Sequence, residues 1–208
     1  MKGVLKLPEE NVSCNSLLSC INVIVDHISE TADRLDKSKI EEMIGSILKA
    51  NRIFVMGAGR SGLVARAFAM RLMHLGFTAF VVGEPTTPGV KDGDLIIAIS
   101  GSGETLTISG SVKVAKDIGA ELIAVTSNPN STIGSLADIA LVVEGRTKND
   151  VDENYLERQM RGDYKSLTPL GTMFEITSLV VLDAIVAELM TLTGLSEADL
   201  KSRHASLE

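Results

Sequence analysis

The segment RIFVMGAGRSG, residues 52–62, joins a short apolar run to a loop of glycines and a serine. A second segment of the same design, DLIIAISGSGET, spans residues 94–105. An apolar strand that ends in glycines and hydroxyls before a helix forms an anion cradle, because backbone N–H groups point outward there and the helix dipole favours negative charge. The two loops therefore predict one phosphate-bearing ligand held between the ends of two strands.

Short apolar runs alternate with amphipathic stretches around these two segments. Strands are predicted at 52–56, 77–82, 94–99, 121–126 and 139–143, and helices at 62–75, 105–118 and 131–137. Strands that are apolar on both faces and separated by helices form a parallel sheet covered on both sides. Right-handed crossovers place every strand-to-helix loop at one edge of such a sheet. Both glycine loops are therefore expected to face the same crevice.

Helical segments are predicted on both sides of this α/β region. Residues 10–50 are expected to form two helices, so that a helical segment 1–50 packs on one structural unit, 51–208. The polar stretch 145–168 is predicted to be a long loop with a short helix near 155–160. A long helix is predicted from 172 to 193 and a short one from 197 to 202. The long helix is apolar nearly all round, which favours a subunit interface over a central helix of a monomer.

Composition narrows the class of partner. The 208 residues fit one domain, and a net charge of −7 argues against a broad surface for nucleic acid or an anionic membrane. Cys14 and Cys20 lack a metal-ligand spacing, so free thiols in a reducing compartment are expected. The most apolar stretch, 176–190, is interrupted by Asp183 and Glu188, and no secretory signal is evident. We expect a cytoplasmic protein with no membrane span and no nucleic-acid partner.

The first loop also fits a different ligand. Gly57, Gly59 and Gly62 match the dinucleotide pattern G-x-G-x-x-G, which expects an acidic residue about 20 positions later. Glu84 lies near that position. A sugar phosphate is favoured because Ser61 places a hydroxyl in the loop and Glu84 lies among turn-forming residues. A dinucleotide, or glycines that serve only as tight turns, remain open alternatives.

Three further residues have two interpretations each. Glu175 at the start of the long helix fits a capping box with Thr172, which the local pattern favours. It also fits a carboxylate base facing the crevice, and the two interpretations are compatible. His74 lies two residues before Gly76, which favours a helix-terminal histidine near a glycine C-cap. His204 lies near the chain end, where a solvated tail is the default. His27 is expected at the surface or in core packing.

The chain resembles the sugar isomerase (SIS) domain family, and within it the 6-phospho-3-hexuloisomerases, over roughly residues 15–205. The resemblance rests on the two glycine loops and on FAMRLMHLG (68–76), VGEPTTP (82–88), PLGTMFE (169–175) and RHA (203–205). It implies a flavodoxin-like three-layer sandwich with a five-stranded parallel sheet. It also implies interconversion of D-arabino-3-hexulose 6-phosphate and D-fructose 6-phosphate without metal or organic cofactor. A homotetramer working beside 3-hexulose-6-phosphate synthase, in the ribulose monophosphate route that fixes formaldehyde, is implied as well.

The resemblance also assigns roles to residues. Glu175 matches the catalytic base, while His74 and His204 would polarise the carbonyl or move hydroxyl protons, with His204 acting in its own or a neighbouring subunit. The implied substrate-binding residues are Gly59, Arg60, Ser61, Ser100, Gly101, Ser102, Gly103, Glu104 and Thr105. The stretch 145–168 is longer than usual for the family. Another SIS isomerase, such as one acting on arabinose 5-phosphate, and a non-catalytic sugar-phosphate sensor are the alternatives.

Overall fold

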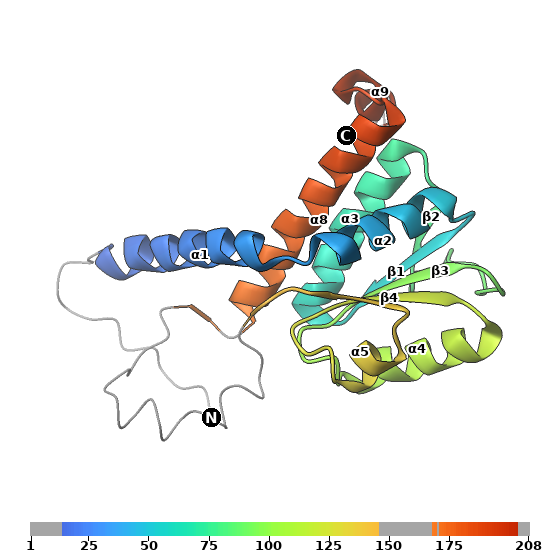
Figure 1. Ribbon diagram of the computed structural model, residues 1–208, viewed down its shortest axis with the longest axis horizontal. Helices are drawn as coiled ribbons and strands as arrows, with labels where there is room; N and C mark the ends of the chain where they lie inside the picture. Colours follow the sequence, from blue (N-terminus) through green and yellow to red (C-terminus); the bar gives the residue numbers. More distant parts are fainter. Residues whose placement is uncertain (1–13, 146–167, 170, 204–208) are drawn as a thin grey trace.

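The computed structural model describes residues 14–145, 168–169 and 171–203 (Figure 1). Its five strands form one parallel sheet in the order β2-β1-β3-β4-β5. The strands are β1 (Ile53–Gly57), β2 (Ala79–Val81), β3 (Leu95–Ile99), β4 (Glu121–Thr126) and β5 (Ile139–Val142). All four neighbouring pairs are parallel, which confirms the predicted architecture. The short helix predicted near 155–160 lies outside the described residues.

Helices cover both faces of the sheet (Figure 1). They are α1 (Asn15–Arg34), α2 (Lys37–Lys49), α3 (Gly59–Leu75), α4 (Leu106–Ile118), α5 (Thr132–Leu136), α8 (Thr172–Thr193) and α9 (Glu197–Ser202). Successive strand residues point to opposite faces. Val55 and Ile97 accordingly belong to the core shared with α2, α3 and α8, whereas Phe54 and Ile96 belong to the core shared with α4 and α5. The three-layer sandwich expected from the sequence is confirmed.

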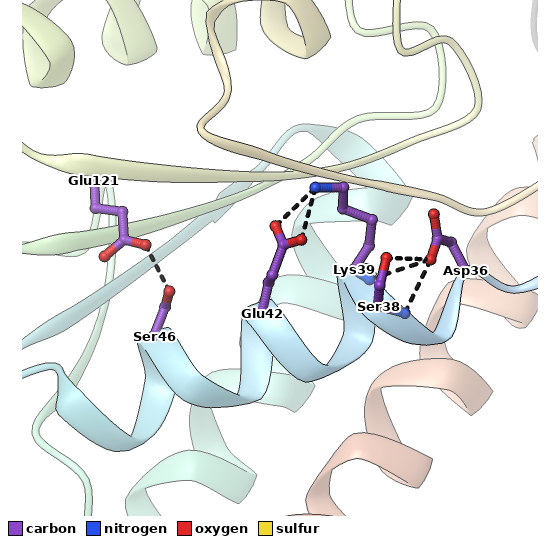
Figure 2. A network of polar contacts seen from close by, with 6 residues as sticks. All are labelled: Asp36, Ser38, Lys39, Glu42, Ser46 and Glu121. Atoms are coloured by element: carbon purple, nitrogen blue, oxygen red, sulfur yellow. Dashed lines mark hydrogen bonds and ion pairs between the residues drawn. The ribbon is translucent and has the colours of Figure 1, made fainter.

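Helix α2 is fixed by polar contacts that Figure 2 shows at close range. Asp36 caps its start by accepting hydrogen bonds from the N–H groups of Ser38, at 2.9 Å, and Lys39, at 3.3 Å. The hydrogen bond from the Ser38 hydroxyl, followed by that from the Lys39 N–H, lowers the pKa of Asp36. Further along, Ser46 Oγ donates to Glu121 Oε1 at 2.5 Å, which ties α2 to the first residue of β4.

Helix α8 spans 22 residues and contains an 18-residue window with a mean hydropathy of 1.8, so by length and composition alone it could cross a membrane. One side packs against α3, α1 and α2, and buries Leu182, Ile185 and Leu189. On the opposite side Val180 is 43% exposed. The expectation that α8 forms a subunit interface stays a prediction, which this exposed apolar side supports.

Candidate functional site

The two glycine loops begin side by side in the structure. β1 and β3 are neighbours, and Gly57 at the end of β1 is in register with Ile99 at the end of β3. In the sheet, β1 lies between β2 and β3. The connection after β1 leads to β2 on one side of β1, whereas the connection after β3 leads to β4 in the opposite direction. The two loops therefore flank the point at which the strand order reverses. Ligands of open α/β sheets bind in the crevice at that point. The prediction that both loops lie at the same edge of the sheet is confirmed, and a ligand crevice between them stays a prediction.

The first loop brings a helix start unusually close to a strand end. A Cβ on Gly57 would lie 2.7 Å from the Ser61 carbonyl oxygen, and one on Gly62 would lie 2.8 Å from the Gly57 oxygen. Gly59 has φ +58° and open space beside it. Because α3 starts here, the N–H groups of residues 59–61 have no acceptor within the helix. The loop thus combines structural glycines with three N–H groups available to an anion.

Hydroxyl groups line the second loop and the first turn of α3. Ser100 is buried, and its Oγ lies 3.5 Å from Thr105 Oγ1. Ser102 Oγ accepts a weak hydrogen bond from the Glu104 N–H at 3.3 Å. Ser61 is half-buried, and its hydroxyl has no hydrogen-bond partner among the described residues. Gly103, which the resemblance implies as a substrate-binding residue, donates its N–H to the Ser100 carbonyl at 3.1 Å.

The start of α8 closes over these loops. A Cβ on Gly101 would lie 3.0 Å from the Phe174 ring, and one on Gly145 would lie 2.5 Å from the Phe174 Cα. Phe174 is only 3% exposed and packs between Gly101, which follows β3, and Gly145, which follows β5. Glu175 follows it and forms an ion pair with Arg60 of α3. Glu175 and Arg60, far apart in sequence, meet at the crevice.

The capping box proposed for Glu175 is wrong. The N-cap of α8 is Gly171, which has φ +87° and no side chain that could accept a hydrogen bond. Thr172 is the first helical residue and therefore cannot cap the helix that it opens. The Glu175 N–H donates to the Gly171 carbonyl at 3.1 Å, while its carboxylate extends to Arg60. A reciprocal capping box occurs instead at α9, between Ser196 and Asp199.

The Glu175 side chain is mostly shielded from solvent, whereas the side chain of its partner, Arg60, is exposed. The Glu175 side chain is 14% exposed and that of Arg60 is 58% exposed. A carboxylate sheltered from water beside two anion loops has the surroundings of a general base. The more exposed guanidinium can contact a ligand that enters the crevice, because Arg presents several donors in a planar fork.

Glu104 is directed away from the crevice in this structure. Its Oε1 accepts the Thr132 N–H and its Oε2 accepts the Thr132 hydroxyl, both at 2.7 Å. The hydroxyl hydrogen bond, followed by the N–H hydrogen bond, lowers the pKa of Glu104. The role of Glu104 as a direct substrate ligand stays a prediction.

His74 is not brought to this site within one chain. It lies at the C-terminal end of α3, whereas Arg60 lies at the N-terminal end, about 20 Å away at 1.5 Å per residue. His74 is 2% exposed and next to the C-cap Gly76, as the helix-terminal interpretation predicted. Arg203 donates to the His74 carbonyl at 2.9 Å.

His204 lies outside the described residues. His27 Nε2 is 3.0 Å from the Glu144 carbonyl oxygen.

The acidic residue of the dinucleotide alternative is already engaged. Glu84 Oε1 accepts hydrogen bonds from Arg66 Nη2 at 2.8 Å and from Nε at 3.0 Å. Glu84 follows a turn, since its N–H donates to the Val81 carbonyl at 3.2 Å. Glu84 is therefore bonded to Arg66 and does not stand at a strand end as the acidic ligand of a ribose, which the dinucleotide alternative requires. No group of three or more metal-ligating side chains occurs within the described ranges.

Sequence reasoning missed the segment after β4, which supports the second loop. Thr126 Oγ1 donates to the Gly101 carbonyl at 3.2 Å, and the Ile133 N–H donates to the Gly103 carbonyl at 3.1 Å. The available signal was the polar run SNPNST, residues 127–132, at the carboxyl end of a third parallel strand. In a parallel sheet that position adjoins the same edge as the glycine loops.

The fold and the two adjacent loops define a parallel α/β protein of the class that binds ligands at the carboxyl edge of its sheet. Residues 46–150 match the SIS domain. A 3-hexulose-6-phosphate isomerase of Bacillus subtilis is 39% identical over 185 residues, which cover 89% of this chain and 95% of that protein. An uncharacterized protein of Archaeoglobus fulgidus is 47% identical over 192 residues, covering 92% of this chain and 100% of its own length.

A solved structure is similar to this chain in both sequence and fold. The structure of a Methanococcus jannaschii protein, from which a function of 3-hexulose-6-phosphate isomerase was inferred, superimposes with a TM-score of 0.74. It is 34% identical, and the match covers 92% of this chain and 99% of the other. The chain belongs to the SIS domain family, in its group of 3-hexulose-6-phosphate isomerases.

Proposed function

We propose that the protein is an isomerase that interconverts D-arabino-3-hexulose 6-phosphate and D-fructose 6-phosphate. The observation that carries the proposal is the enclosed Glu175 carboxylate, held by Arg60 over two anion loops at one sheet edge. The 39% identity with a 3-hexulose-6-phosphate isomerase supports the choice of substrate. This geometry provides an anchor for a phosphate and a base for a carbon acid, which are the two requirements of the reaction.

The reaction moves a carbonyl from C3 to C2. Glu175 removes the C2 proton, which gives a cis-2,3-enediolate, and returns the proton at C3. One carboxylate can serve both carbons because they are adjacent, provided that water is excluded. Arg60, already in contact with Glu175, is positioned to stabilise the negative charge that develops on the enediolate oxygens.

The phosphate end would occupy the two loops. Ser61, Ser100, Ser102 and Thr105 supply hydroxyls there, and the first turn of α3 supplies N–H groups. Binding energy from this remote group holds the reacting carbons against Glu175 and so contributes to turnover.

The covalent structure of the substrates makes the two directions unequal. In the 3-ketose, the oxygen that would close a five-membered ring on C3 is O6, which is phosphorylated. That substrate therefore stays open-chain, whereas fructose 6-phosphate can close through O5. Ring opening is thus required only in the reverse direction, and a residue that assists it should affect that direction more.

We also propose that the enzyme is a homotetramer in which His204 completes the site of a neighbouring subunit. Arg203, the residue before it, is bonded to His74 at the end of α3 opposite Arg60. Figure 1 places α9 at the end of α8 that is remote from Glu175. The proposed setting is the cytoplasm, in the ribulose monophosphate route that fixes formaldehyde, with 3-hexulose-6-phosphate synthase as the preceding enzyme.

A coupled assay tests the reaction. The 3-hexulose phosphate is supplied and fructose 6-phosphate formation is recorded, with arabinose 5-phosphate as the competing substrate. Glu175→Gln should lower kcat by about a hundredfold or more while sugar-phosphate binding persists. Turnover of arabinose 5-phosphate alone would establish the other isomerase, and binding of both sugars without turnover would establish a sensor.

Mixing two inactive variants tests the shared site. Glu175→Gln and His204→Gln subunits are unfolded together, refolded and assayed. If His204 acts across a two-fold interface, random pairing restores about a quarter of the activity, because half of the pairs are mixed and each contains one intact site of two. No recovery would place His204 in its own subunit's site.

A further inference from the structure

The second glycine loop contains a carboxylate where a phosphate is expected to bind. Glu104 lies between Gly103 and Thr105, and like charges in such a loop would oppose binding. Both carboxylate oxygens are nevertheless bonded to Thr132, at 2.7 Å each. The negative charge is thus directed to the start of α5 and away from the crevice.

The same part of the chain holds the rest of the loop. The Ser127 N–H donates to the Gly101 carbonyl at 3.0 Å, and the Ile133 N–H donates to the Gly103 carbonyl at 3.1 Å. A Cβ on Gly103 would lie 1.8 Å from Ser131 Oγ, so the loop is seated directly on the N-cap of α5. These bonds occupy the carbonyl groups of Gly101 and Gly103 and tie the loop to the segment after β4.

We propose that Glu104 is a positioning residue, which through its paired hydrogen bonds to Thr132 holds the second loop in its phosphate-binding shape without touching the substrate. This inference rests on the proposed function for the identity of the anion. Among residues 101–105, all of which the structure describes, Glu104 is the only side chain that forms a pair of hydrogen bonds with α5. Thr132 lies 28 positions from Glu104 in the sequence and belongs to the support, not to the site.

Two substitutions remove opposite ends of the same contact. Glu104→Ala removes both acceptors, and Thr132→Val removes the hydroxyl donor while the N–H donor remains. The probe is fructose 6-phosphate, whose dissociation constant is measured by calorimetry, together with KM and kcat in the coupled assay. Each substitution should weaken binding several-fold, up to about tenfold for Glu104→Ala, with kcat within about twofold of the unmodified protein. Thr132→Ser, which keeps the hydroxyl, is the matched control and should bind normally.

The double variant separates positioning from direct contact. If Glu104 acts only through Thr132, the double variant should bind no more weakly than Glu104→Ala, because the second substitution has nothing left to remove. Normal binding by Thr132→Val with weak binding by Glu104→Ala would show a direct substrate contact and overturn the proposal. Tighter binding by Glu104→Ala would show that the charge opposes the phosphate, and would overturn it too. An unmodified protein that neither binds nor converts the sugar phosphate would instead refute the proposed function.

Discussion

Phe174 is expected to position Glu175, the proposed base, as well as to fill the core, and Phe174→Leu tests both roles. The ring packs against Gly101 of the second loop, and the next residue is Glu175. A smaller side chain would let the first turn of α8 shift relative to the loop. Because displacement of a reacting group by 1 Å can cost about a hundredfold in rate, kcat should fall at least about tenfold.

The effect on stability follows from burial. A Phe side chain buries about 150–250 Å², which at about 25 cal/mol per Å² corresponds to roughly 4–6 kcal/mol as an upper estimate. Complete removal in Phe174→Ala should therefore cost about 3–5 kcal/mol, a large part of the stability of a typical domain. Phe174→Leu retains most of the apolar volume and should cost about 1–1.5 kcal/mol, which leaves a folded protein to assay.

Phe68→Leu is the matched control. Phe68 is 1% exposed, belongs to the same core cluster and lies in the middle of α3, away from the loops. Urea unfolding should give similar losses for both variants, while only Phe174→Leu loses turnover in the coupled assay. If the two variants had equal kcat, Phe174 would be a core residue alone and the positioning argument would be refuted.

Three other perturbations have distinct expected outcomes. Ser61→Ala and Ser102→Ala should mainly raise KM in the coupled assay; an unchanged KM would place the phosphate elsewhere. Gly103→Ala should destabilise more than the matched Gly83→Ala in urea unfolding, because both sites have positive φ but only Gly103 lies against another side chain; equal losses would contradict this. Partial burial raises the pKa of Asp138, but hydrogen bonds from Lys116 and the Leu122 N–H lower it overall. The stabilisation is therefore lost as pH falls below the ordinary value of 3.8, so the advantage of the native protein over Asp138→Asn in urea should shrink there; a constant difference would contradict it.

The sheet was predictable because its signals are local. Apolar runs bounded by glycines gave all five strands to within two residues at either end, and the parallel order followed from alternation with helices. The largest discrepancies are at β2, predicted as 77–82 and observed as Ala79–Val81, and at α3, which begins three residues earlier than predicted. β2 is an edge strand with β1 as its only neighbour, so its ladder is short. α3 starts early because Ala58 is extended and Gly59 takes a positive φ directly after the strand.

The site was predictable only in part, because its decisive contacts are long-range. The pairing of Arg60 with Glu175 spans 115 positions, and that of Glu104 with Thr132 spans 28, so no local pattern encodes either. The capping box at Glu175 was predicted from a local pattern, but the N-cap of α8 is Gly171 and not Thr172. Gly171 has a positive φ, which favours glycine, and glycine has no side chain that could form a capping box. The separation of His74 from Arg60, in contrast, was available from the sequence. Both residues border one predicted helix, and its rise per residue sets the distance.

Residues with a proposed role in the reaction lie at both ends of α3. Its N-terminus presents Arg60 and Ser61 to the loops and to Glu175, while its C-terminus holds His74 and, through Arg203, the end of α9. The proposed enediolate pathway needs a second group to move protons between the two oxygens, because Glu175 would already carry the proton between the two carbons. The described residues place one carboxylate and several neutral hydroxyls at the crevice, and His27 is engaged with the Glu144 carbonyl. His204 titrates near neutrality and is the group that we propose for this task; in the proposed homotetramer, an adjacent subunit would supply it from the end of α3 that holds His74.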